Sequence, residues 1–105
     1  MIAKTPEPPY YAVIFSSIRT ESDNGYSEAA IRMAELAETQ PGFLGLESAR
    51  NEIGITVSYW NNLESIRNWK NNAEHLLVQQ KGKDIFYKSY KIRVCKVERE
   101  YGFDK

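Results

Sequence analysis

The sequence contains one cysteine, one histidine and no long apolar run, and its charges balance. A single cysteine, Cys95, excludes an internal disulfide and any metal site built from several cysteines, and it is compatible with a reducing cytoplasm. Lysine plus arginine number 14, as do aspartate plus glutamate, so no net field recruits nucleic acid or an anionic membrane. The first residues include three prolines, so we expect neither a signal peptide nor a membrane span. These absences predict a soluble, cytoplasmic protein.

The composition is that of a small globular domain. Of the 105 residues, 42% are hydrophobic and 27% are charged, which is too apolar for a disordered chain. A chain of this length hides at most roughly two thirds of its extended surface, so a monomer would have modest stability. Because proline cannot join a central strand, we expect a proline-rich lead-in over residues 1–9 and a single domain over residues 10–105.

The clearest strand and the best-capped helix lie next to each other, between residues 53 and 80. A period of two over residues 53–60 predicts a strand with large apolar residues on one face. The smaller residues and one tryptophan share the other face: Gly54, Thr56, Ser58 and Trp60. Asn61 is the predicted N-cap of the helix that follows, with Glu64 returning the hydrogen bond. Apolar residues then recur at helical spacing, among them Leu63, Ile66, Trp69, Ala73, Leu76 and Leu77.

Three more strands and one more helix complete the predicted order. Residues 10–18 form a strand that is apolar on both faces, and a polar turn over residues 20–24 precedes a helix that ends before Gln40-Pro41-Gly42. Residues 43–50 form a hairpin with the strand at 53–60. After a turn at 81–84 and a short apolar patch at 85–87, the last strand runs over 90–101. Its apolar residues change phase partway, which predicts a β-bulge near Cys95.

The order β-α-β-β-α-β predicts a ferredoxin-like α+β subunit, an antiparallel four-stranded sheet with two helices on one face. Two helices cover one face only, whereas the first strand is apolar on both. We therefore expect a homodimer in which two sheets pack face to face and bury the second apolar face.

Three residues are candidates for a site, each with a structural alternative. His75 is a candidate general base, because imidazole changes its charge near neutral pH; the alternative is a histidine on the helix surface. Trp60 and Trp69 are candidate walls of an aromatic pocket, and the alternative is core packing between strand and helix. No second histidine or cysteine lies at ligand spacing, so no metal site is expected. Basic residues between 81 and 96 lack an RNP-type motif, which favours a solvated face over nucleic acid.

Several of these features together resemble those of a known protein family. The element order, the Gln40-Pro41-Gly42-Phe43 turn, and Ser58-Tyr59-Trp60 leading into a helix with Trp69 and His75 are similar to antibiotic biosynthesis monooxygenase (ABM) proteins. The resemblance covers residues 10–101. It implies a dimeric α+β barrel and, for some members, cofactor-free oxygenation of aromatic or quinol substrates.

On this resemblance we expect a small cofactor-independent monooxygenase, without metal, that acts on an aromatic or quinol-like molecule. The expected site places His75 as the base and Trp60 and Trp69 as walls. Ser16, Ser58 or Arg50 are the expected orienting donors. The alternative is a non-catalytic module that binds or senses a small molecule on the same dimeric scaffold.

Haem breakdown, which some relatives of this family catalyse, is less favoured. That branch uses an asparagine on the first strand, a tryptophan on the second helix and a histidine ten residues after the tryptophan. Trp69 matches, but Gln79 stands ten residues later, and the first strand offers Ser16 and Ser17. An amide oxygen is a poor iron ligand beside imidazole, so we expect no haem.

Overall fold

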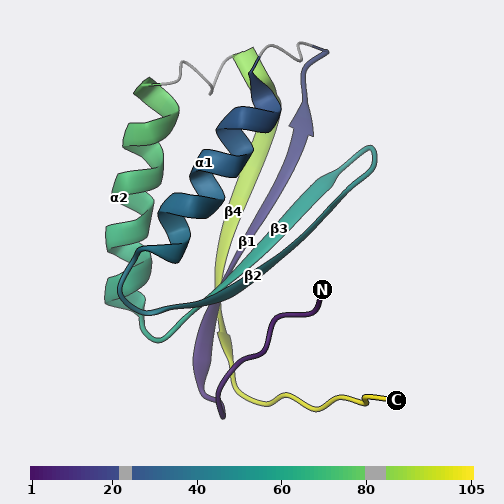
Figure 1. Cartoon of the computed structure of the whole chain (residues 1–105), viewed down its shortest axis with the longest axis vertical. Coiled ribbons are helices and arrows are strands. Elements are labelled where there is room, and N and C mark those ends of the chain that lie inside the picture. The colour runs from purple at the N-terminus through teal and green to yellow at the C-terminus, as the bar shows by residue number, and fades with distance from the viewer. Residues whose placement is uncertain (22–24, 80–84) are drawn as a thin grey trace.

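The computed structural model describes residues 1–21, 25–79 and 85–105, and it forms one sheet with both helices on the same side (Figure 1). The elements in chain order are β1 (Tyr10–Arg19), α1 (Tyr26–Glu38), β2 (Phe43–Arg50), β3 (Gly54–Trp60), α2 (Leu63–Gln79) and β4 (Tyr87–Val97). The strands lie in the order β2-β3-β1-β4, and every neighbouring pair is antiparallel. The predicted ferredoxin-like α+β fold is confirmed.

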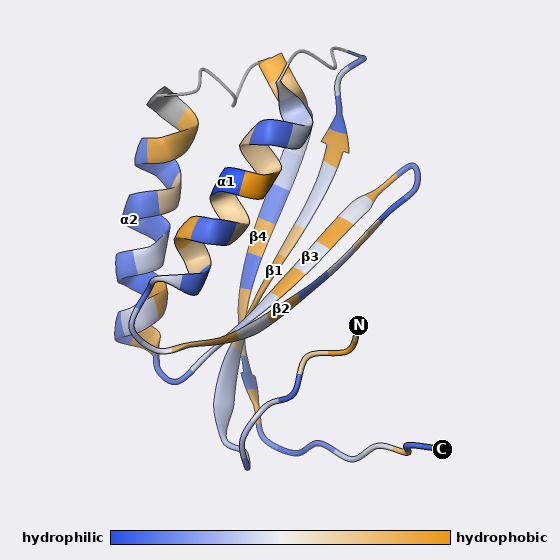
Figure 2. Ribbon diagram, viewed as in Figure 1, coloured by the Kyte–Doolittle hydropathy of each residue, from blue (hydrophilic) through white to orange (hydrophobic). Residues whose placement is uncertain are grey.

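The strand register decides which face of the sheet the helices cover. Trp60 pairs with Tyr11, and Val13 forms a buried cluster with Trp60 and with Ile66 of α2. The helix-facing side of β3 therefore carries its small and polar residues, and the large apolar residues of β3 lie on the open face. Along both helices, hydrophobic and hydrophilic residues alternate at short intervals, as expected for elements packed on one side only (Figure 2).

Trp60 is the centre of the helix–sheet packing. Its side chain is 0% exposed, its ring stacks on that of Trp69 at 5.7 Å, and Phe43 approaches edge-on at 5.4 Å. The indole Nε1–H donates to Ser58 Oγ at 2.9 Å, so the one polar atom of the buried ring has a partner. This cluster fixes the start of α2 to the end of β3.

The Pro-Gly turn before β2 also contacts the start of α2. Gly42 has φ 85°, which favours glycine, and its carbonyl accepts from the backbone N–H of Asn61 at 2.8 Å. A Cβ atom at Gly42 would lie 2.2 Å from Ser65 Oγ. The turn therefore needs glycine both for its conformation and for the close approach of α2.

The N-cap of α2 is Asn62, which corrects the prediction of Asn61. The backbone N–H of Ser65 donates to Asn62 Oδ1 at 2.8 Å, the usual bond from the third helical residue to its cap. Asn61 instead gives its backbone N–H to Gly42, which places it in the turn before the cap.

The last strand also differs from its prediction. β4 pairs with β1 without interruption from Tyr10↔Val97 to Ile18↔Ser89, so no bulge lies at Cys95. The register shift occurs between Ile18 and Arg19 instead. The strand begins at Tyr87 and ends at Val97. Of the two residues that changed the phase, Val97 lies on the open face opposite Tyr10, and Tyr101 lies in the tail after the strand. The turn predicted at 81–84, and most of the one at 20–24, lie outside the described residues.

The lead-in and the tail meet one end of the open face of the sheet, and both termini lie on the side away from the helices (Figure 1). Glu47 accepts from the backbone N–H of Ala3 at 2.8 Å and from the Tyr59 hydroxyl at 2.6 Å. Glu100 in the tail accepts hydrogen bonds from Thr5 and Tyr10. Neither helix, over its described residues, is long and apolar enough to cross a membrane.

Candidate functional site

The helix-facing side of the sheet is a ladder of cross-strand rows, and the candidate site residues are distributed over them. From the Trp60 end the rows are Trp60–Tyr11, then Leu46–Ser58–Val13–Val94, then Ser48–Thr56–Phe15–Ile92, then Arg50–Gly54–Ser17–Tyr90. Because side chains alternate between faces, all of these project toward the helices.

The Trp60 end of this surface is closed by packing. Ser58, Val13 and Ile66 are buried together with Trp60, and Trp69 is half-buried above them. Ser58 is engaged by the indole of Trp60. Trp60 and Ser58 thus form the floor of the packed interior, and Trp69 is the member of the pair that solvent reaches.

The middle row is only partly covered by the helices. Thr56 and Phe15 are half-buried, and Ser48 and Ile92 are exposed, although all four lie on the helix-facing side. Solvent therefore reaches the space between sheet and helices at this level. The chemistry there is mixed, with one aromatic ring, one aliphatic side chain and two hydroxyls.

The row beyond it holds a guanidinium group over a glycine. A Cβ atom at Gly54 would lie 2.1 Å from Cζ of Arg50, so the Arg50 side chain crosses the sheet through space that only glycine leaves. Arg50 Nη2 donates to Ser17 Oγ at 2.5 Å, and Nη1 donates to the Ser17 carbonyl at 3.5 Å. Ser17 is 3% exposed. A buried serine thus positions an otherwise exposed arginine.

The Tyr26 ring lies beside this guanidinium group and belongs to a cluster of aromatic rings. Its Cζ lies 5.9 Å from the centre of the Tyr26 ring, and Arg19 Cζ lies 3.5 Å from the same ring. Tyr87 packs edge-on against Tyr26 at 6.1 Å and against Phe15 at 5.5 Å. These contacts bring β1, β4 and the start of α1 together at one end of the sheet.

Tyr87 keeps its proton at neutral pH. Burial raises the pKa of the Tyr87 phenol above its usual value, and the nearby Tyr26 hydroxyl, with which it hydrogen-bonds, raises this pKa further. Arg50 and Arg19 act in the opposite direction, because their positive charges favour the phenolate. Tyr87 is therefore a neutral phenol close to two cations.

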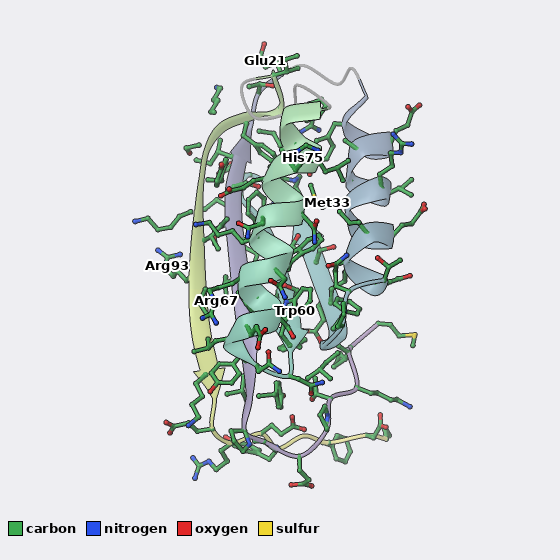
Figure 3. The ribbon with its side chains drawn as sticks, turned by 90° about the vertical axis from the view of Figure 1, so that its left-hand side faces the viewer. Glu21, Met33, Trp60, Arg67, His75 and Arg93 are labelled. Carbon is green, nitrogen blue, oxygen red and sulfur yellow. The ribbon has the colours of Figure 1, made fainter. Side chains whose placement is uncertain are left out.

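The structure brings together only part of the predicted site. Ser16 pairs with Ile55 and Lys91 and lies on the open face of the sheet, on the opposite side from Ser58 and Arg50. His75 is exposed on α2 and lies toward the end of that helix farther from Trp60 (Figure 3). Trp60, Trp69 and Ser58 gather at one end, and Arg50 lies at the other.

The predicted site did not include four residues of the Arg50 end: Ser17, Gly54, Tyr26 and Tyr87. Two signals for them were present. Ser17 shares its parity with Val13 and Phe15, and Gly54 is the one residue without a side chain in a strand of bulky residues. Among the described residues, no three histidine, cysteine, aspartate or glutamate side chains gather as a metal site.

Comparisons with known proteins show the family and the fold. The family model for antibiotic biosynthesis monooxygenase matches residues 9–81, and the chain belongs to this family. It is 52% identical, over 99% of its length and 93% of the relative, to the uncharacterized protein YqjZ of Bacillus subtilis (strain 168).

Solved structures share the fold at low sequence identity. SnoaB, a cofactor-independent oxygenase from Streptomyces nogalater, has a TM-score of 0.72 at 10% identity, covering 89% of this chain and 97% of SnoaB. PA3566 from Pseudomonas aeruginosa has a TM-score of 0.68 at 12% identity, covering 91% of this chain and 99% of that chain. At these identities the likeness concerns the fold.

Proposed function

We propose that the protein is a cofactor-independent monooxygenase whose aromatic or quinol-like substrate binds between the helices and the sheet. The observation that carries the proposal is the partly open middle row, where Phe15 and Thr56 lie under the helices and remain within reach of solvent. Membership of the family, and the same fold in an oxygenase that works without a cofactor, support it.

Such a reaction needs three things from the protein. A base removes a proton from the substrate, and the resulting anion passes an electron to O₂ and combines with the superoxide formed to give a peroxide. Loss of a second proton from the same carbon with cleavage of the O–O bond leaves a carbonyl group on the substrate and releases the other oxygen atom as water, so the substrate supplies both electrons. Apolar surroundings keep the reacting pair away from bulk water, and fixed donors stabilise the negative charge that develops. In this proposal Trp69 and Phe15 supply the apolar walls, and Arg50 supplies the donors.

The proposed base is His75. Imidazole accepts a proton near neutral pH, and this chain has one histidine. α2 runs from the Trp60 end toward the end where β1 finishes and α1 begins, so His75 lies toward the same end of the molecule as the Arg50 row (Figure 1). Ser16 has no part in the proposal, because it lies on the other face of the sheet.

Oxygen uptake with a panel of quinols and anthrones tests the reaction, in protein treated with a chelator. We expect uptake above the uncatalysed rate, and we expect His75→Gln to lower kcat/KM at least about tenfold and to remove the acid limb of its pH profile. An unchanged profile in His75→Gln would exclude this residue as the base. The competing function is a non-catalytic binding module, and it is favoured if these compounds bind without oxygen uptake.

We also propose that the protein works as a homodimer through the open face of the sheet. Ile55 of this face is 45% exposed, Ile53 in the hairpin turn next to it is 55% exposed, and Tyr101 and Phe103 of the adjoining tail are 91% and 89% exposed. Face-to-face packing with a second copy would remove this apolar surface from water.

Light scattering after size exclusion is expected to give about twice the 12.1 kDa of one chain. Ile55→Lys should shift the protein toward monomer, because it places a charge in the middle of the proposed interface. Ile31→Lys is the matched control, since Ile31 is 59% exposed on α1, on the helix side of the molecule. A monomeric native protein, or equal dissociation by both variants, would contradict the proposed interface.

A further inference from the structure

The Arg50 row has the chemistry of a binding subsite rather than of a structural ion pair. An arginine that serves a structural ion pair has a carboxylate as its partner. Within residues 1–21, 25–79 and 85–105, no aspartate or glutamate lies within ion-pair distance of Arg50. Its two hydrogen bonds both go to atoms of one neutral serine, Ser17.

The position of Arg50 is fixed although its head remains accessible. Gly54 leaves the path for the side chain, and the Ser17 hydroxyl and carbonyl hold Nη2 and Nη1 from below. Ser17 itself is 3% exposed, so the group that orients the guanidinium is part of the packed interior. A guanidinium group carries five N–H donors in a planar fork, and these two bonds use two of them. The remaining donors are available to a planar anion.

The surroundings specify more than a bare anion. Tyr26 and Tyr87 present aromatic rings at this end of the sheet, and the half-buried ring of Phe15 lies in the next row. Arg19 adds a second positive charge over the Tyr26 ring. The Tyr87 phenol lies near the guanidinium groups and stays neutral, and its hydrogen bond is made to Tyr26. A ligand that fits this combination has a planar oxyanion attached to an aromatic ring system.

We propose that Arg50, positioned by Ser17 and Gly54, binds the carboxylate of an acidic aromatic substrate whose ring extends over Phe15 into the middle row. That this ligand is a substrate rests on the proposed function. The inference adds its chemical class, which is aromatic carboxylates rather than neutral quinols. Arginine and carboxylate match in shape and charge, and two parallel N–H···O bonds fix the orientation of the ring. The carboxylate thus sets which ring carbon lies in the middle row.

The test is a binding measurement that needs no turnover. Isothermal titration compares 1-hydroxy-2-naphthoate with 1-hydroxy-2-naphthamide, which has the same ring and hydroxyl but a neutral head group. We expect the acid to bind the native protein about 10- to 100-fold more tightly, the difference that a charged hydrogen-bonded pair gives. Arg50→Met should remove this preference and leave the affinity for the amide within about twofold.

Two further variants separate the position of the charge from its presence. Gly54→Ala keeps the guanidinium but pushes its flexible end away from Ser17, so it should lose most of the preference for the acid while the protein stays folded. Arg32→Met removes an exposed arginine from α1, outside the proposed dimer interface, and should change neither affinity. Thermal melts of each variant confirm folding.

Several results would overturn the proposal. The first is that the native protein binds the acid and the amide with equal affinity. The second is that it binds neither. The third is that the Arg50→Met protein still prefers the acid. Inorganic phosphate and acetate form a third arm, because binding of either as tight as that of the naphthoate would show a general anion site without aromatic selection. Tight naphthoate binding that depends on Arg50 but is accompanied by no oxygen uptake would leave the subsite standing and exclude the oxygenase instead.

Discussion

Trp60→Ala is expected to lower the free energy of unfolding by about 3–5 kcal/mol, at the upper end of what large-to-small core substitutions cost. The ring is 0% exposed and contacts Trp69 and Phe43, so its loss leaves a cavity that neither neighbour fills. Small domains are stable by only about 5–15 kcal/mol. Urea denaturation followed by far-UV circular dichroism measures the loss, and the variant should be close to unfolding at physiological temperature.

Two other variants separate the contributions of the Trp60 ring, its hydrogen bond and the neighbouring Trp69 to stability. Trp60→Phe keeps most of the packing but leaves the buried Ser58 hydroxyl without its indole partner, which should cost about 1–3 kcal/mol. Trp69→Ala should destabilise less than Trp60→Ala, because Trp69 is half-buried. If Trp60→Ala were mild and Trp69→Ala severe, Trp60 would not be the centre of the core, and its predicted role as a pocket wall would return.

The element order could be predicted because most segments follow one period. The strand at β3 alternates strictly, α1 and α2 repeat every three to four residues, and Pro41-Gly42 separates α1 from β2. In β4 the alternation predicted that a strand exists but not the residues at which it begins and ends. Tyr101 has the composition of a strand residue, yet it lies beyond Val97 in the tail, and no local pattern marks that boundary.

The cap of α2 shows where local reasoning ends. Asn61 and Asn62 are equally good cap residues by type, and Glu64 favoured Asn61 by the capping-box spacing. The structure selects Asn62, because the backbone N–H of Asn61 bonds to the carbonyl of Gly42. That bond joins residues on different elements, so it depends on how the turn docks against the helix.

The site could be predicted less well than the fold, and for a related reason. β1 is apolar on both faces, so its own pattern does not say which of Ser16 and Ser17 faces the helices. The pairing of Val13 with Ser58 beside Trp60 decides it in favour of Ser17. Arg50 lies over Gly54 because of the hairpin register. A register shifted by one residue would have put the Arg50 side chain on the opposite face of the sheet.

Gly42→Ala is the second substitution for which we expect a large effect, a loss of at least about 3 kcal/mol in the free energy of unfolding. Two costs combine. A left-handed backbone costs a residue with a Cβ about 1–2 kcal/mol. The added Cβ would also lie 2.2 Å from Oγ and 2.8 Å from Cβ of Ser65, so the turn or the first turn of α2 must move. Chemical denaturation measures the total.

Gly25→Ala separates the two costs, because Gly25 has nearly the same backbone conformation without the crowding. Its φ is 79° against 85° at Gly42, and no atom lies within 4 Å of where its Cβ would be. The Gly25 variant should therefore lose only the conformational part, about 1–2 kcal/mol. The difference between the two variants reports how closely the turn packs on Ser65. Equal losses would mean that α2 yields freely at its start, in which case the contact does not fix the helix against the sheet at the Trp60 end.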